Sequence, residues 1–309
     1  MASWQSHFIQ KLIRMTWDKD AAPGLEAARL RLREAKLSAR FARVPADVEV
    51  RRAMAGPVRA EWIEPQGAQF HRVILYFHGG GYMMGSLDTH RNLVARLAKA
   101  ASARALILNY RLAPEHPFPA ALEDALAAYK SLLIEGFEPG GIVFAGDQAG
   151  AGLALAAALT LRDNRAPMPG AIVALSPWTD LALSGRSILR NAAKDATLSI
   201  EMLAYFAQNY LQGKTLPTNP LASPLYARLS GLPSMLIHAG ASEILRDDAT
   251  RLAERAHKAG VDCSIEVYDG QPHAFQLFDM LPEADASVSR VGAFIKSRTV
   301  SVPMRMAAE

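Results

Sequence analysis

Short apolar runs of strand length alternate with helix-length segments along most of the chain, and this alternation limits the folds that it can adopt. The expected strands lie at 73–77, 105–109, 142–145, 171–175, 234–238 and 264–268, and the expected helices at 91–101, 119–133, 149–161, 247–259 and 283–297. This order predicts an α/β protein with an open, doubly wound and mostly parallel sheet, covered by helices on both faces. Segments 48–50 and 58–62 alternate as half-exposed strands do, which predicts an antiparallel edge.

Two segments fall outside the alternation, and both have a helical pattern. Residues 1–45 include a stretch rich in Ala, Leu, Arg and Glu, and residues 181–223 form a long insertion with a helical centre at 200–211. The insertion follows a strand at the carboxyl edge of the sheet, where the sites of α/β proteins open. We therefore expect one core domain, 46–180 with 224–300, beneath a helical cap or lid. The N-terminal helices could instead bind a membrane or a partner, but covering apolar surface of the same chain explains them better.

The composition is that of an ordinary globular enzyme. Of the 309 residues, 50% are hydrophobic and 21% are charged, and the net charge is +4, with basic residues scattered among acidic ones. Basic residues scattered in this way do not form the clustered positive surface that binds nucleic acid. The single Cys263 excludes an internal disulfide and a cysteine-based metal site, and we find no signal-peptide pattern or membrane span. We expect a cytoplasmic protein that acts on a small molecule without a cofactor or metal; a homodimer stays open.

The strand expected at 142–145 runs directly into Gly146-Asp147-Gln148-Ala149-Gly150 and then into a helix of small residues. A strand, a Gly-x-Ser-x-Gly turn and a helix form a nucleophile elbow, which lifts a serine hydroxyl above the sheet. The glycines let the backbones approach closely, and the helix N-terminus favours developing negative charge. This chain has the turn but carries Gln148 at the nucleophile position, and a carboxamide is not a nucleophile.

A glycine-rich loop supplies a second part of the same chemistry. His78-Gly79-Gly80-Gly81-Tyr82 follows the strand expected at 73–77, and such a loop can present backbone N–H groups to an oxyanion. The chain resembles the hormone-sensitive-lipase family of α/β-hydrolases at three places, namely this loop, the run 109–121 (NYRLAPEHPFPAA) and the elbow. The resemblance implies the α/β-hydrolase fold and carboxylesterase activity on short acyl chains. It also implies an oxyanion hole made by the N–H groups of Gly80, Gly81 and Ala149.

Chain order indicates the other two catalytic groups, because an acid and then a histidine follow the nucleophile in such hydrolases. His273 lies on the loop after the last expected strand, which suits a mobile general base. Glu243 follows the strand expected at 234–238 and stands where similar proteins usually carry an aspartate. We expect Glu243 to orient His273. Asp247 is the alternative acid, although a charge at a helix start also suits the helix dipole without any catalytic role.

Other side chains near these motifs complete the predicted site. Neither Ser86 nor Ser176 stands on an elbow, so both are poor substitutes for the missing hydroxyl. An acyl pocket is expected from seven large side chains: Tyr82, Met83, Met84, Trp178, Tyr205, Phe206 and Phe275.

Three functional interpretations remain open. The first is a hydrolase scaffold for short-chain acyl esters, built for a Ser-His-acid mechanism through an acyl-enzyme and strongly impaired by Gln148, whether that residue is natural or engineered. The second is a non-catalytic small-molecule-binding pseudoenzyme, of the kind exemplified by a plant hormone receptor that resembles the same family. The third is direct attack by a water that His273 activates and Gln148 holds. Intact His273, Glu243 and glycine loop favour the first, because a retired site has no physical need of them.

Overall fold

Eight strands form a single sheet in the part of the chain that the computed structural model describes, which is residues 2–20, 25–38 and 43–299. The sheet order is β1-β2-β4-β3-β5-β6-β7-β8. The strands are β1 (Val48–Ala55), β2 (Val58–Pro65), β3 (Gln69–Phe77), β4 (Ala103–Leu108), β5 (Ile142–Asp147), β6 (Ala171–Leu175), β7 (Ser234–Gly240) and β8 (Cys263–Tyr268). β2 pairs antiparallel with β1 and β4, and all other pairs are parallel. The predicted α/β fold, a mostly parallel sheet flanked by helices, is confirmed.

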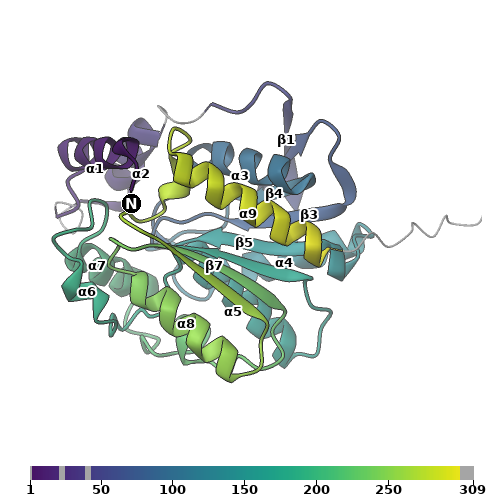
Figure 1. Cartoon of the computed structure of the whole chain (residues 1–309). Helices are drawn as coiled ribbons and strands as arrows, with labels where there is room; N and C mark the ends of the chain where they lie inside the picture. The colour runs from purple at the N-terminus through teal and green to yellow at the C-terminus, as the bar shows by residue number, and fades with distance from the viewer. Residues whose placement is uncertain (1, 21–24, 39–42, 300–309) are drawn as a thin grey trace, which may run out of the picture.

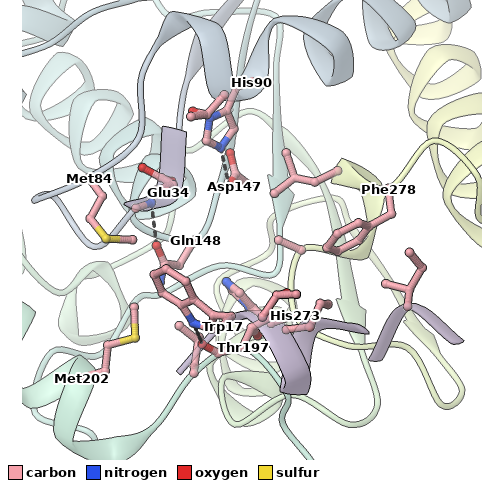
Figure 2. Close-up of a pocket in the computed structure, with 18 of the residues that line it drawn as sticks. Trp17, Glu34, Met84, His90, Asp147, Gln148, Thr197, Met202, His273 and Phe278 are labelled. Carbon is pink, nitrogen blue, oxygen red and sulfur yellow. Dashed lines mark hydrogen bonds and ion pairs between the residues drawn. The ribbon is translucent and has the colours of Figure 1, made fainter. Parts of the chain in front are cut away.

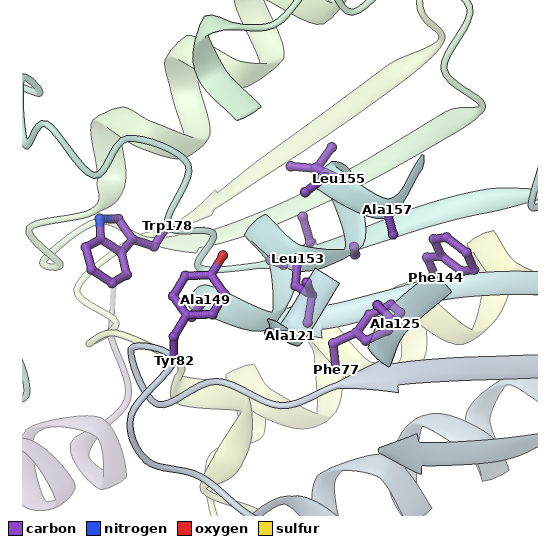
Figure 3. Close-up of a cluster of buried hydrophobic side chains, with 14 of the residues drawn as sticks. Phe77, Tyr82, Ala121, Ala125, Phe144, Ala149, Leu153, Leu155, Ala157 and Trp178 are labelled. Carbon is purple, nitrogen blue, oxygen red and sulfur yellow. The ribbon is translucent and has the colours of Figure 1, made fainter. Parts of the chain in front are cut away.

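Helices cover both faces of this sheet (Figure 1). One face carries α3 (Leu87–Ala101) and α9 (Pro282–Arg298), and the other carries α4 (Ala120–Ile134), α5 (Ala149–Asp163) and α8 (Arg246–Lys258). The two-residue period of a strand explains how one strand serves both layers. Tyr76 of β3 packs in the cluster with α3 and α9, whereas Phe77 packs with α4 and α5, as Figure 3 shows for Phe77 beside Phe144 and Leu153.

The remaining helices gather at one end of the molecule in Figure 1. They are α1 (Trp4–Thr16), α2 (Ala27–Ser38), α6 (Ser187–Arg190) and α7 (Ile200–Leu211). The N-terminal segment and the insertion are joined by hydrogen bonds, since Trp17 Nε1 donates to the Thr197 carbonyl at 2.8 Å and the Tyr205 hydroxyl donates to the Leu25 carbonyl at 3.1 Å. Their division from the core as a cap stays a prediction. Residues 1, 21–24, 39–42 and 300 of the predicted division lie outside the described residues.

Candidate active site

Gln148 stands on a sharp turn between β5 and α5. Its backbone angles, φ 46° and ψ −115°, lie in a region that is strained for any residue with a side chain. The neighbouring strand holds the turn, because the Gln148 N–H donates to the Leu175 carbonyl at 2.9 Å and the Gln148 carbonyl accepts from the Trp178 N–H at 3.0 Å. Gly150 has no room for a side chain, since a Cβ there would overlap the Phe77 carbonyl oxygen. The turn therefore directs the residue 148 side chain away from the sheet and into a cavity.

The Gln148 side chain reaches the glycine loop. Its Oε1 accepts two hydrogen bonds, from the Gly80 N–H at 2.8 Å and from the Gly81 N–H at 2.7 Å. Gly81 has φ +63°, and a Cβ on it would overlap the Phe206 ring, so only glycine fits at this point. Ala149 begins α5, and its N–H is one of the first N–H groups of that helix, which have no partner within the helix. The amide oxygen of Gln148 thus occupies the place that the sequence assigns to a substrate oxyanion.

His273 and Glu243 form a buried pair beside this turn. His273 Nδ1 lies 2.6 Å from Glu243 Oε2, and Glu243 Oε1 accepts from the Gly240 N–H at 2.9 Å. A carboxylate accepts hydrogen bonds only, so Nδ1 carries a proton, and in the neutral ring Nε2 therefore keeps its lone pair. Burial lowers the pKa of His273, but the hydrogen bond and negative charge of Glu243 outweigh that effect and leave the pKa raised. Burial raises the pKa of Glu243, and the contact with His273 offsets this only in part.

Two further residues show how the pair is positioned. Ser176 Oγ accepts from the Ala274 N–H at 3.1 Å and also hydrogen-bonds Glu243, so it ties the histidine loop to the acid. The sequence indicates Ser176 only as a poor substitute nucleophile, although its position directly after β6 also suits a positioning role. Asp247, the alternative acid, accepts from the Ser187 N–H at 2.9 Å and pairs with Arg190 instead. The structure therefore joins His273 to Glu243 and gives Asp247 other partners.

A cavity of about 220 Å³ connects these groups (Figure 2). Gln148 and His273 both line it, and Figure 2 shows Trp17, Met84 and Met202 around them. Its wall is mostly apolar. Much of this wall comes from α1, which contributes Ile9, Leu12, Ile13 and Thr16, and from Trp17 directly after that helix. Sequence reasoning did not assign these residues to the pocket, because only the fold brings the start of the chain over the elbow.

Of the seven side chains predicted for an acyl pocket, Met84 lines this cavity and the other six lie outside its described wall. Tyr82 stacks on Tyr210 with ring centroids 3.8 Å apart, and Trp178 lies in the same buried cluster (Figure 3). Met83 and Phe206 are fully buried in that cluster, with Tyr205 packed against it; Phe275 packs instead in a separate core with Ile9. These six side chains lie in or against buried clusters, and their place in an acyl pocket stays a prediction.

A buried polar network lies behind the elbow, and sequence reasoning missed it. Asp147 accepts from the Tyr76 hydroxyl at 2.8 Å and from the Gly79 N–H at 2.9 Å, and it pairs with His90 at 3.3 Å. Burial raises the pKa of Asp147, but His90 and Tyr76 outweigh burial and leave it lowered. Because Asp147 binds the Gly79 N–H, it anchors the glycine loop to the end of β5, directly before Gln148. Glu34 of α2 anchors the far end of the loop by accepting from the Gly85 N–H at 2.7 Å.

Within the described residues, no helix is long and apolar enough to cross a membrane, and no group of three or more His, Cys, Asp or Glu side chains is arranged to hold a metal ion.

Comparisons with known proteins agree with this fold. Residues 74–277 match a family model described as the α/β hydrolase fold. An acetyl-hydrolase from Streptomyces hygroscopicus is 40% identical over 303 residues, which cover 97% of this chain and 98% of that protein. An esterase from Acinetobacter venetianus is 36% identical over 295 residues, covering 95% of this chain and 97% of that protein. The crystal structure of an esterase from the bacterial hormone-sensitive lipase family is 41% identical with a TM-score of 0.92, covering 97% of this chain and 100% of that one.

Proposed function

Because the chain belongs to the α/β-hydrolase fold family, and within it to the hormone-sensitive-lipase type, we propose that its cavity is a site for hydrolysing short-chain acyl esters, with the nucleophile position occupied by Gln148. The observation that carries the proposal is the convergence of three parts on one cavity: the elbow, the glycine loop and the His273–Glu243 pair. Similar proteins named acetyl-hydrolase and esterase support a small acyl group.

Each part has a distinct role in the proposed reaction. His273, held by Glu243 with its Nε2 lone pair free, takes the proton from the nucleophile and later returns it to the leaving alcohol. The N–H groups of Gly80, Gly81 and Ala149 stabilise the oxyanion of the tetrahedral intermediate. The apolar wall from α1 and Met202 binds the carbon portions of the ester. The helical segments over the cavity act as its cap.

Gln148 impairs this reaction in two ways. It supplies no hydroxyl, and its own Oε1 holds the two loop N–H groups that an ester carbonyl needs. The second effect also weighs against direct water attack on a bound ester, because the ester carbonyl would first have to displace the Gln148 amide. The alternative is a small-molecule-binding pseudoenzyme, which the blocked loop and the remaining apolar cavity favour. The cytoplasmic location and the possible homodimer remain predictions.

The test is the single change Gln148→Ser. It restores a hydroxyl beside His273 and frees the Gly80 and Gly81 N–H groups without a change in the backbone. We expect turnover of p-nitrophenyl acetate or butyrate with an acyl-enzyme burst, at a kcat up to about 10⁶ times that of the parent chain.

Gln148→Ala is the matched control, because it also frees the loop but adds no hydroxyl; we expect it to stay near background. Circular dichroism checks that both variants fold. If a folded Gln148→Ser variant is inert on a broad panel of short esters and lactones, the hydrolase proposal is wrong and the pseudoenzyme interpretation replaces it.

A further inference from the structure

The Gln148 side chain matches an acetylated serine atom for atom. Beyond Cβ it carries Cγ, then Cδ with Oε1 and Nε2, whereas O-acetylserine carries Oγ, then a carbonyl carbon with its oxygen and a methyl group. The match extends to the surroundings, since Oε1 accepts from the Gly80 and Gly81 N–H groups at 2.8 and 2.7 Å. Cδ is bonded to that oxygen at about 1.2 Å, so it lies where the acyl carbon of an acetyl-enzyme would lie. The chain therefore holds an internal analogue of the intermediate that the proposed mechanism forms.

We propose that the site hydrolyses this analogue, so that Gln148 is slowly converted to glutamate by its own active site. The inference rests on the proposed function, because it assigns the same roles to the glycine loop and His273. Hydrolysis of an acetyl-enzyme needs a polarised carbonyl and a base that activates water. Both are present here. The side-chain carbonyl of Gln148 accepts hydrogen bonds from two N–H groups, and His273, whose neutral ring has a lone pair on Nε2, lines the same cavity (Figure 2).

The chemical step needs water alone as co-reactant. His273 Nε2 takes a proton from water as the water oxygen bonds to Cδ of Gln148, and the charge that develops on Oε1 is held by the Gly80 and Gly81 N–H groups. His273 then gives this proton to the amide nitrogen of Gln148, the Cδ–N bond breaks, and ammonia leaves. The new carboxylic acid ionises and ammonia takes up its proton, so the products are a glutamate side chain and ammonium.

Which bond breaks follows from the difference between the Gln148 side chain and a true acyl-enzyme. In an acetylated serine the bond to Oγ breaks and the enzyme is regenerated. In Gln148 the corresponding atom is carbon, which cannot leave, and the only group that can leave is the amine. The reaction therefore happens once per chain and needs no added substrate. The product carboxylate lies next to the N-terminus of α5, where the helix dipole favours negative charge.

Peptide mass spectrometry tests this directly on the full-length protein. Trypsin cleaves after Lys130 and Arg162, and the peptide 131–162 contains Gln148 as its sole carboxamide side chain, so conversion at 148 is read as the mass change of that one peptide. The folded protein is incubated in ¹⁸O-labelled water at mildly alkaline pH, because the pKa of His273 is raised and only its neutral ring is a base, and label in this peptide is followed over time. Peptide 60–72 serves as the reference, because its two glutamines, Gln66 and Gln69, are exposed.

We expect peptide 131–162 to gain label at least about 100-fold faster than peptide 60–72, which is the lower range of general-base catalysis. The His273→Ala variant and the urea-unfolded chain should lose this difference. Protein that is already converted on purification also supports the proposal, provided that His273→Ala retains Gln148. Equal rates for the two peptides, or an unchanged rate in His273→Ala, would overturn it. An active Gln148→Ser variant alongside an unconverted Gln148 would overturn self-hydrolysis alone and leave the proposed function standing.

Discussion

Changing Glu243 to glutamine in the Gln148→Ser background should remove most of the restored activity, and the structure explains how. Glu243 is fully buried, and each of its oxygens has a donor: Gly240 N–H on Oε1 and His273 on Oε2. In the variant the remaining oxygen is needed by the Gly240 N–H, because a buried unpaired donor is costly. The new NH₂ group then faces His273 Nδ1, which must become an acceptor. The ring proton moves to Nε2, and the base that should activate the serine is lost.

The expected loss in kcat is about 10⁴-fold, the size of wrong-tautomer effects in serine proteases, or roughly 5 kcal/mol in activation free energy. The assay is kcat for p-nitrophenyl acetate at saturating substrate, with thermal unfolding to show that the variant remains folded. Asp247→Asn in the same background is the matched control, because Asp247 binds the Ser187 N–H and Arg190 rather than His273. Near-parental turnover in Glu243→Gln together with loss of activity in Asp247→Asn would refute the assignment of the acid.

Three other results are expected. In Gln148→Ser, kcat/KM should fall as the pH drops through the raised pKa of His273, above the ordinary value of about 6.5, because only the neutral ring is a base; an acid limb below that value would contradict this. In the same background Trp17→Ala should raise KM on the order of 10-fold while kcat changes little, since Trp17 lines the cavity wall; steady-state kinetics measure both. Gln148→Ser should lower the free energy of unfolding by about 1–3 kcal/mol, because two hydrogen bonds to the loop are lost; urea unfolding that shows equal or greater stability would argue against these bonds.

The sheet could be predicted because strands buried on both faces are continuous apolar runs, and 73–77 is such a run within β3. The first residues of β3, from Gln69, carry exposed side chains, so no apolar run marked them. The order of the strands in the sheet could not be predicted from the sequence. β4 lies between β2 and β3, and such pairing depends on contacts between segments that are far apart in the chain, which periodicity does not contain.

Some parts of the candidate site could likewise be predicted from the sequence, and others could not. Chain order and motifs led to Glu243 and His273, which the structure joins by a hydrogen bond. The cavity wall could not be predicted, because Ile9 and Trp17 approach Gln148 only through tertiary contacts. The conformation of the Gln148 side chain could not be predicted from the sequence either. That its amide oxygen accepts from both loop N–H groups depends on side-chain length and on the strained turn, neither of which a motif specifies.

The retained polar groups bear on whether the site is a working hydrolase with one residue changed or a binding protein. A buried carboxylate costs free energy unless it is fully paired, and Gly240, Ser176 and His273 offset part of that cost for Glu243. A binding protein that uses only the apolar wall gains nothing from maintaining this arrangement. The loop N–H groups, in contrast, need an acceptor in either kind of protein, and Gln148 provides one. Gln148 thus provides the acceptor that the loop needs and leaves His273 and Glu243 in place, which favours the proposed impaired hydrolase over the binding protein.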